Sequence, residues 1–337
     1  MREGELLAHI YDRSAGLGSD VIVGPGDDCA LVEVGGAHVL VATDQLIAGR
    51  HFDPDTTPVE LIARKAIARN VSDIAAMAGT PTHTLCAASL PAGYRHADEL
   101  FDCCHLWANA FGCPLVGGDI ATTTGPLALT VTIMGTPHPK RGSVLRSGAR
   151  PGDGLFVTGP LGSGYASGWH LRFEPRVTTA RALADGLGGR LHAMIDLSDG
   201  LGLDGARIAK ASGVRLEIEA KRVPLSEEAA GWRSACEGED YELLVCADAD
   251  EIEGLVRIGR VAEGKGCVVI DDEGTHDASS LGWEHGCSPS AAHAWSRRLA
   301  SARRWGVPCD RRTSCDSSAI SAPARRPSCA RSRAGWG

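Results

Sequence analysis

Acidic residues recur directly after short apolar runs in this chain, and this arrangement restricts the folds open to it. Short apolar runs bounded by glycine are typical of buried β-strands. In α/β proteins, ligands bind in the loops that follow the strands. The acids in these positions are Asp27-Asp28 after residues 21–23, Asp44 after 39–41, Asp119 after 114–116, and Asp196 with Asp199 after 193–195, while Asp73 stands in a helical pattern. The pattern predicts one site at which several carboxylates meet.

Carboxylates that share a site repel one another unless cations neutralise them. Carboxylates, hydroxyls and water are the ligands that Mg²⁺ prefers, and glycine lets the backbone approach a phosphate closely. We therefore interpret the set as a phosphate site that holds several Mg²⁺ ions. Taken alone, each acid is also typical of a turn or a helix N-cap, and that alternative stays open. The sequence contains no P-loop motif, so a nucleotide would be held by Mg²⁺ and loop amides.

Strand-like runs and helical patterns are mixed in both halves of the 337 residues, which predicts two α/β (α+β) domains. Residues 1–140 contain strand patterns at 21–23, 38–42, 84–90, 115–116 and 127–134, and helical patterns at 4–13, 58–77 and 97–110. Residues 145–286 contain strand patterns at 154–158, 193–197, 214–218, 242–246 and 267–270, and a helical pattern at 203–211. The stretch 137–148, rich in Pro, Gly, Ser and basic residues, marks the expected boundary.

Residues 287–337 differ in composition from the rest of the chain. From Ser288 on, ten Arg and two Asp give +8, so the preceding 287 residues carry −16 within a net charge of −8. No apolar period survives in this tail, which predicts disorder. A basic nucleic-acid-binding tail and a frameshifted reading of GC-rich DNA both fit its composition. The acidic body suits a site that gathers metal cations and is poor support for nucleic-acid binding, so we expect no nucleic-acid partner.

The cysteines and the hydropathy indicate the compartment. The twelve cysteines include no CxxC pair and no zinc-ligand spacing, which favours free thiols in a reducing compartment. No apolar run approaches the ~20 residues of a membrane span, and the first residues do not resemble a secretory signal. We therefore expect a cytoplasmic protein without a membrane partner.

Seven segments, taken in order, resemble the thiamine-monophosphate kinase family, which belongs to the superfamily of aminoimidazole ribonucleotide synthetase and selenophosphate synthetase. The resemblance covers about residues 3–285. The His51-Phe52 pair and the last segment point to this family within its superfamily. The segments are GDDCA (26–30), TDQL (43–46) with GRHF (49–52), KAIARNVSDIAAM (65–77), GGD (117–119), RSG (146–148) with PGD (151–153), IDLSDGL (195–201) and GEDYEL (238–243).

The resemblance implies a reaction and a set of site residues. ATP would donate its γ-phosphoryl group, directly and in line, to the phosphate of thiamine monophosphate, giving thiamine diphosphate. The implied Mg²⁺ ligands are Asp28, Thr43, Asp44, Asp73, Asp119 and Asp196, with Asp199 on a further ion. The implied ATP contacts are Gly118, Asp119, Arg146 and Ser198, and the implied substrate contacts are His51, Glu239 and Trp283. No general base is required, because the acceptor phosphate is already ionised.

The resemblance also implies a quaternary structure. In the two-domain fold of the aminoimidazole ribonucleotide synthetase family, the N-terminal sheet pairs across a homodimer into a barrel. The C-terminal domain covers the nucleotide cleft. On the residues alone, His51 is more typical of a loop histidine, and Trp283 is also typical of a surface or packing aromatic, so those alternatives stay open.

The chain departs from the family pattern in three places. Ala42 stands where the family often has a hydroxyl residue. The segment 170–176 follows 159–164 almost at once, so we expect a shortened second domain with exposed sheet surface. After Gly282-Trp283-Glu284-His285, Gly286 stands where the family has a closing aromatic and the foreign tail begins, so we expect residues past about 286 to be disordered and dispensable for activity.

Three other functions stay open on the sequence. The first is another ATP-using enzyme of the same superfamily that acts on a different acceptor. The second is an inactive protein that binds nucleotide or thiamine diphosphate, which the shortened second domain would favour. The third is a nucleic-acid binder that uses the basic tail.

Overall fold

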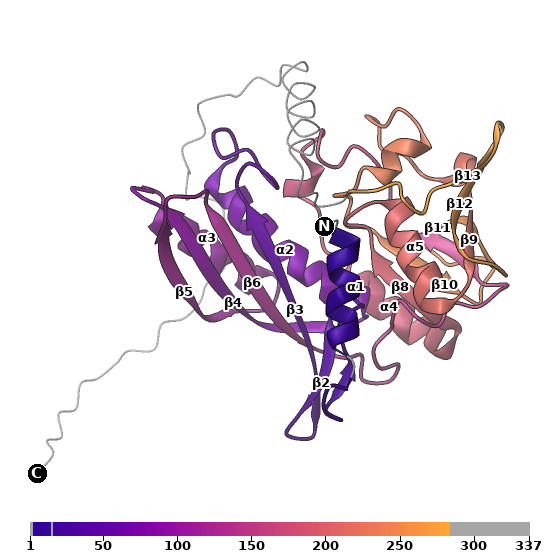
Figure 1. Cartoon of the computed structure of the whole chain (residues 1–337), viewed down its shortest axis with the longest axis horizontal. Coiled ribbons are helices and arrows are strands. Elements are labelled where there is room, and N and C mark those ends of the chain that lie inside the picture. Colours follow the sequence, from indigo (N-terminus) through magenta and orange to yellow (C-terminus); the bar gives the residue numbers. More distant parts are fainter. Residues whose placement is uncertain (1–2, 15, 284–337) are drawn as a thin grey trace, which may run out of the picture.

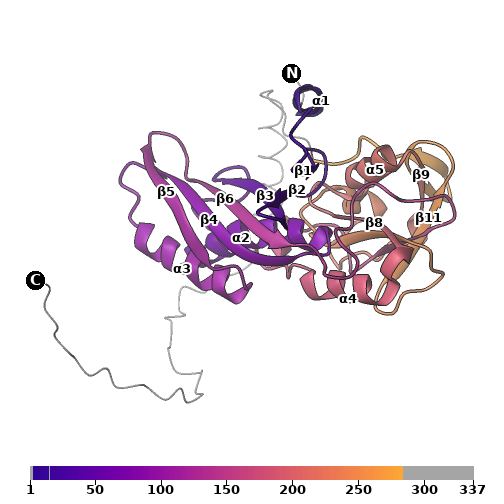
Figure 2. The same ribbon diagram turned by 90° about the horizontal axis from the view of Figure 1, so that it is seen from below.

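The computed structural model describes residues 3–14 and 16–283, which form two α/β units, each built on one mixed sheet (Figures 1 and 2). The predicted two-domain α/β fold is confirmed at this level. The expectations for residues 287–337 lie outside the described residues. Among the helices of the described part, none is long and apolar enough to cross a membrane.

Figure 1 shows the first unit as a twisted sheet with helices behind it. Its strand order is β1-β2-β3-β6-β4-β5, and only β4 and β5 run parallel. Helices α2 and α3 pack on one face, where Leu40, Ile67 and Ile133 are fully buried. The elements are α1 (Glu3–Arg13), β1 (Val21–Val23), β2 (Ala30–Val34), β3 (Ala37–Ile47), α2 (Val59–Ala76), β4 (Thr80–Pro91), α3 (Ala97–Ala110), β5 (Leu115–Thr123) and β6 (Ala128–Thr136).

The second unit is a sheet in the order β13-β12-β9-β11-β7-β10-β8, with α4 on one face and α5 on the other (Figure 2). Its first elements are β7 (Gly154–Val157), η1 (Trp169–Leu171), α4 (Val177–Leu187), η2 (Gly188–Arg190), β8 (Leu191–Asp196), α5 (Leu201–Ser212), β9 (Arg215–Glu219) and η3 (Ala220–Arg222). The remaining elements are η4 (Trp232–Cys236), β10 (Leu243–Ala247), β11 (Val256–Ala262), β12 (Gly266–Asp271) and β13 (Gly274–Asp277).

The expected exposure of the second sheet is found only in part. Val256 of β11 and Ile270 of β12 are exposed, but every residue of β7 and of β10 is buried, because α4 and α5 cover the two faces of these strands. Helix α4 follows the shortened segment 170–176 directly and supplies the cover that we expected to be missing. The chain is therefore short here without leaving its core open.

Helix α2 joins the two units. It packs on β3 and β6 of its own sheet and also contacts β8, α4 and η1 of the second unit. Enclosure on several sides explains why this helix buries charged and polar residues, including Arg64, Lys65, Asn70 and Ser72, along with its apolar ones. The predicted helix at 58–77 is confirmed, but its role as the link between the units was not predicted.

Strands β3 and β5 are longer than predicted, and this changes the placement of the candidate residues that they carry. Strand β3 continues to Ile47, so Asp44 lies inside a strand and not in the loop after it. Strand β5 continues to Thr123, so Gly118 and Asp119 also lie within a strand. The expectation that these residues follow a strand end is wrong, whereas Asp28 lies in a loop and Asp196 ends β8.

Candidate active site

Three predicted acids come together at the junction of the two units. Asp28 lies in the loop between β1 and β2, Asp73 on α2, and Asp196 at the end of β8. One carboxylate oxygen from each lies within 4.8 Å of the other two. Residues from three distant segments therefore form one cluster, which is the arrangement expected of a cation site.

A cavity of about 300 Å³ opens onto this cluster, and we call it the acidic cavity. Most of the predicted site residues line it. They are Asp28, Thr43, Asp44, His51, Asp73, Arg146, Asp196, Ser198, Asp199, Glu239 and Trp283. The residues that line it without having been assigned a role are Leu7, Tyr11, Asp27, Arg69, Arg207 and Tyr241.

The cluster disfavours its own ionisation in the absence of cations. Burial raises the pKa of Asp73 well above its usual value, and the neighbouring Asp44, Asp196 and Asp28 raise it further. Burial and Asp28 likewise raise the pKa of Asp196, although Ser72 Oγ donates to its Oδ2 at 2.6 Å and opposes that rise. A bound cation would stabilise the carboxylates and reverse both shifts.

Asp28 supplies the test of whether these residues suit a metal ion. Its side chain is fully buried, and its Oδ1 accepts a hydrogen bond from Arg146 Nη2 at 2.7 Å. Its Oδ2 is buried without a hydrogen-bond partner in the described part of the chain. Burying an unsatisfied carboxylate oxygen costs free energy, and a cation at this point removes the cost. The donor set of three carboxylates fits Mg²⁺.

Arg146 connects the second unit to the loop before β2. Besides Asp28, it contacts Asp27, whose Oδ2 accepts from the Arg146 backbone N–H at 3.0 Å. Burial raises the pKa of Asp27 to about 6, and the adjacent Asp28 adds to the effect. The guanidinium thus lies beside the acids, where its planar N–H groups can pair with phosphate oxygens.

Arg69 is a site residue that the sequence reasoning did not identify. Its guanidinium lies 3.1 Å from Asp44 Oδ2, and the side chain of Asn70 accepts from the Asp44 backbone N–H at 3.2 Å. Asp44 is therefore held against α2 from two sides. The spacing of Arg69 four residues before Asp73 places both on one face of a helix and was a usable signal.

The loop 198–200 is held by residues of α5. Asp204 accepts from the backbone N–H groups of Asp199 and Gly200, both at 2.9 Å. Arg207 lies 2.6 Å from Asp199 and also pairs with Asp204. Gly200 has φ +115°, and a Cβ there would meet the Cys236 backbone at 2.6 Å, so only glycine fits. Neither Asp204 nor Arg207 was identified from the sequence.

The predicted substrate residues His51, Glu239 and Trp283 share the cavity wall. His51 Nδ1 accepts from the Ile47 backbone N–H at 2.8 Å, which places the ring proton on Nε2. The Trp283 backbone N–H donates to Asp199 O at 2.9 Å, so this residue is tied to the loop that carries Ser198.

Gly118 and Asp119 do not reach the acidic cavity of their own chain. Asp44 and Gly118 lie on one ladder of paired residues across β3, β6, β4 and β5. Three strand spacings separate them by about 14 Å, too far to share an ion. Both line another cavity, of about 640 Å³, beside Phe101 and His105 of α3.

Asp240 lies between Glu239 and Tyr241, and its carboxylate accepts from the Gly162 backbone N–H at 3.0 Å. Burial raises its pKa from 3.8 to about 8, with Glu242 and other acids adding to the effect. Between these values the folded protein keeps the proton and the unfolded chain loses it, so wild-type stability falls as the pH rises.

Asp240→Asn removes that proton linkage. We compare the free energy of unfolding of the variant with that of wild type. The variant value minus the wild-type value should rise by up to about 1.4 kcal/mol for each pH unit up to about pH 8 and stay constant above it. Urea unfolding at pH 5, 7 and 9 measures it. A difference that stays constant over this range would contradict the shifted pKa.

These two sheets and the acidic cavity at their junction define a class of protein. The family model described as "AIR synthase related protein, N-terminal domain" matches residues 26–136, and the model for the C-terminal domain of the same proteins matches residues 150–272. The chain is thus an AIR synthase related protein with both domains present.

Comparison with whole proteins shows which family within this class the chain belongs to. The chain is 37% identical to thiamine-monophosphate kinase from Rhodopirellula baltica over 270 residues, or 74% of this chain and 83% of the relative. It is 37% identical to the Escherichia coli K12 protein of that name over 72% of this chain and 81% of the relative. A solved structure described as "AaThiL complexed with AMPPCP and TMP" matches with TM-score 0.73 and 29% identity, over 85% of this chain and 97% of that chain. The chain belongs to the thiamine-monophosphate kinase family.

Proposed function

We propose that this chain transfers the γ-phosphoryl group of ATP to thiamine monophosphate and releases thiamine diphosphate. Family membership gives the reaction, and the cluster of Asp28, Asp73 and Asp196 is the observation that supports it in this chain. Phosphoryl transfer between two polyanions depends on positioning and on neutralising charge, and this cluster provides sites for the necessary cations.

We assign the metal ions to the acids of the cavity. Asp28, Asp73 and Asp196 hold one group of Mg²⁺ ions, Thr43 and Asp44 contribute to another, and Asp199 binds a further ion. Bound Mg²⁺ neutralises the phosphate oxygens and orients them for in-line displacement. The assignment is supported by the unpartnered Oδ2 of Asp28 and by the raised pKa values of Asp73 and Asp196.

The other residues of the cavity bind the two substrates. Arg146 and the Ser198 hydroxyl contact the phosphates of ATP. His51 can donate through Nε2 to the phosphate of thiamine monophosphate. The carboxylate of Glu239 faces the cationic ring system of thiamine, and Trp283 stacks on a ring.

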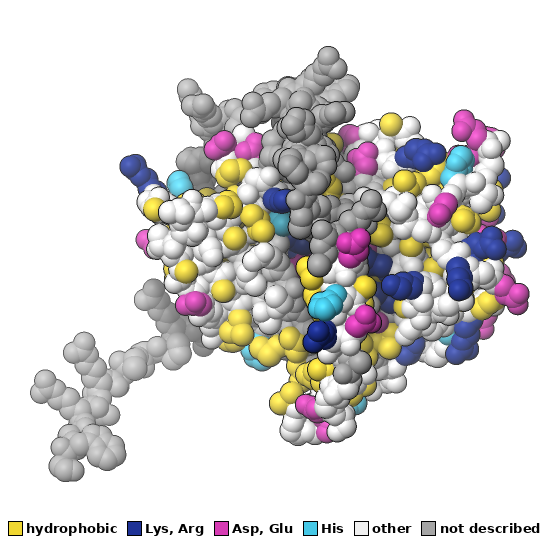
Figure 3. Space-filling view, in the orientation of Figure 1, with side chains coloured by type: hydrophobic (Ala, Val, Ile, Leu, Met, Phe, Trp, Pro, Cys, Tyr) yellow, Lys and Arg dark blue, Asp and Glu magenta, His cyan; other side chains and the backbone are white. Residues whose placement is uncertain are grey.

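We further propose that the protein is a homodimer in which the first sheets of two chains pair into a barrel. Among the strands that the structure describes, β5 lies at the edge of its sheet, and Val116 and Ile120 on it are more than half exposed. An exposed, apolar edge strand favours pairing with another chain. The face of the first unit in Figure 3 shows mostly hydrophobic and uncharged side chains, whereas charged ones gather on the second unit.

The dimer also accounts for Gly118 and Asp119. They lie far from the acidic cavity of their own chain, and a partner chain pairing along this sheet would bring its own copies of them toward that cavity. We propose that each site takes Gly118 and Asp119 from the other chain.

We also propose that the two domains span residues 1–140 and 145–286. The ranges matched by the two family models, 26–136 and 150–272, support this division.

The test of the function is a product assay with ATP and Mg²⁺, using thiamine monophosphate and free thiamine as parallel acceptors. We expect thiamine diphosphate from the monophosphate and no phosphorylated product from thiamine. Turnover only with another phosphorylated or carbonyl acceptor would place the chain elsewhere in the superfamily. Nucleotide binding without turnover of any acceptor would indicate an inactive binding protein.

A further inference from the structure

Lys65 is a fully buried lysine at the centre of the junction, and the mechanism above does not use it. Its ammonium group has three N–H donors, and the fold provides three acceptors. The first is the backbone carbonyl oxygen of His51 at 2.8 Å, the second is Nδ1 of His170 at 2.7 Å, and the third is Oε2 of Glu239. The three acceptors come from three separate segments of the chain.

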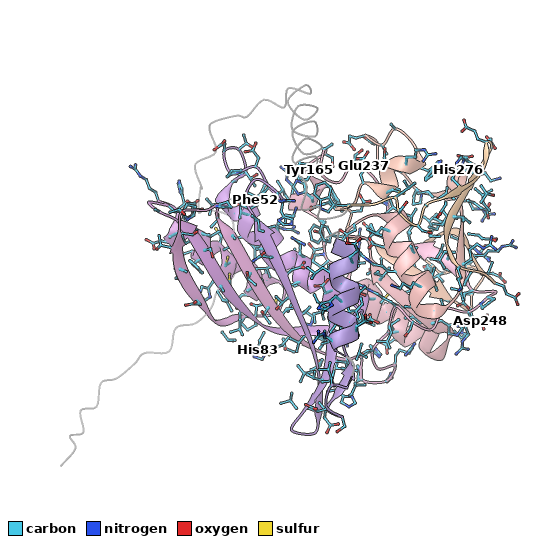
Figure 4. All side chains as sticks on the ribbon, in the orientation of Figure 1. Phe52, His83, Tyr165, Glu237, Asp248 and His276 are labelled. Carbon is cyan, nitrogen blue, oxygen red and sulfur yellow. The ribbon has the colours of Figure 1, made fainter. Side chains whose placement is uncertain are left out.

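His170 takes part as a neutral acceptor. Burial, together with the charge of Lys65, lowers the pKa of His170 to about 4. Because an ammonium group can only donate, Nδ1 accepts and the ring proton lies on Nε2. The His170 ring also stacks on Tyr165, with ring centroids 4.4 Å apart. Tyr165 and Phe52, which follows His51, lie on the two sides of the junction in Figure 4.

Glu239 depends on Lys65 for its charge. Burial would raise the pKa of this carboxyl, but the charge of Lys65 holds it well below its usual range. Burial lowers the pKa of Lys65 to about 8 and Glu239 opposes that shift, so the pair is ionised at neutral pH. Lys65 pairs with Oε2 of Glu239, and the Glu239 side chain also borders the acidic cavity.

The backbone around Glu239 is strained. Glu239 has φ +68° and Tyr241 has φ +56°, a region that costs free energy for residues other than glycine. The Glu239 N–H donates to Ser198 O at 2.7 Å, and the Tyr241 ring stacks on Phe173 at 3.9 Å. These contacts fix the backbone, whereas Lys65 is the cation that fixes the direction of the Glu239 side chain.

We propose that Lys65 is a positioning residue that ties His51 to Glu239 and thereby sets the affinity for thiamine monophosphate. This inference rests on the proposed function, because it takes His51 and Glu239 as the residues that meet the two ends of that substrate. Of the three acceptors of Lys65, two belong to these residues. A lysine with only a packing role would not be expected to form hydrogen bonds with two residues that bind the substrate.

Lys65→Met tests the inference, with Arg64→Met as the matched control. Arg64 is also buried on α2, but its guanidinium contacts Leu171 O and Glu174 and neither substrate residue. We expect Lys65→Met to raise the KM for thiamine monophosphate about tenfold or more and the KM for ATP less than about twofold. Arg64→Met removes a buried cation from the same helix and should change both KM values less than about twofold.

Hydrogen exchange of residues 238–242 gives a readout that does not depend on the reaction. We expect faster exchange there in Lys65→Met than in wild type, and no change in Arg64→Met. If wild type fails to phosphorylate thiamine monophosphate, the proposed function is wrong, and the exchange rates still decide whether Lys65 holds this loop.

Lys65→Gln covers the case in which Lys65→Met does not fold, since the amide keeps N–H donors at this position. It should raise the KM for thiamine monophosphate less than Lys65→Met does, again with little effect on the KM for ATP. Equal changes of both KM values in Lys65→Met or Lys65→Gln, or unchanged exchange at 238–242, would overturn the inference.

Discussion

Replacing Asp73 by Asn will lower turnover at saturating substrate by about a thousandfold or more, since metal-based charge stabilisation is worth several kcal/mol. One carboxylate oxygen of Asp73 lies within 4.8 Å of an oxygen of Asp28 and of one of Asp196. An amide cannot supply the negative charge that holds Mg²⁺ there. We expect Asp44→Asn to have a comparable effect. The measurement is the rate of thiamine diphosphate formation across a Mg²⁺ titration.

The stability of the Asp73→Asn variant separates a lost metal site from a damaged fold. Burial and the neighbouring acids raise the pKa of Asp73, so its ionised form opposes folding when no cation is bound. Without Mg²⁺ the variant should therefore melt at the same temperature as wild type or higher, and it should gain less stability when Mg²⁺ is added. Asp102→Asn, an exposed acid in the middle of α3, is the control and should change neither property. Most of kcat remaining in both Asp73→Asn and Asp44→Asn would contradict the multi-metal assignment.

The convergence of Asp28, Asp73 and Asp196 was predictable because each stands where the local pattern marks a loop or a buried helix. The extent of β3 and β5 was not. In β3 one face is uncovered, so polar residues such as Thr43 alternate with apolar ones and the apolar run ends before the strand does. In β5 the Gly117-Gly118 pair reads as a loop. A Cβ at Gly118 would meet Cys86 O at 1.8 Å, so this glycine serves close strand contact instead.

The cationic residues of the site escaped the sequence reasoning for another reason. Each of these cations pairs with an acid from a distant segment or a neighbouring loop; they are Lys65, Arg69 and Arg207. Local spacing in the sequence does not reveal which acid is the partner. Lys65 carried one usable signal, since it lies three residues after the apolar Ile62 and therefore on the same face of the predicted helix. A charged residue on such a face indicates a buried partner but does not identify it.

Mixed dimers of two inactive variants will regain activity if Asp119 acts across the dimer. In a dimer of one Asp119→Asn chain and one Asp73→Asn chain, one site combines the intact acid cluster of the first chain with the intact Asp119 of the second. The other site carries both substitutions. We expect either variant alone to be nearly inactive, and the mixed dimer to show about half the wild-type turnover, since one of its two equivalent sites is complete. Co-expression with two different tags and sequential purification isolates the mixed dimer for the assay.

The matched control pairs Asp73→Asn with Asp196→Asn. Both residues belong to the acid cluster of a single chain, so every site in that mixed dimer lacks one acid and no activity should return. Activity that returns in the first mixed dimer but not in the second shows that the partner chain supplies Asp119. If each site were built from one chain alone, both sites of the first mixed dimer would contain one substitution and would stay inactive. Absence of recovery in the first mixture, or full activity of Asp119→Asn alone, would contradict the shared site. The free edge of β5 would then need another explanation than completion of the neighbouring cavity.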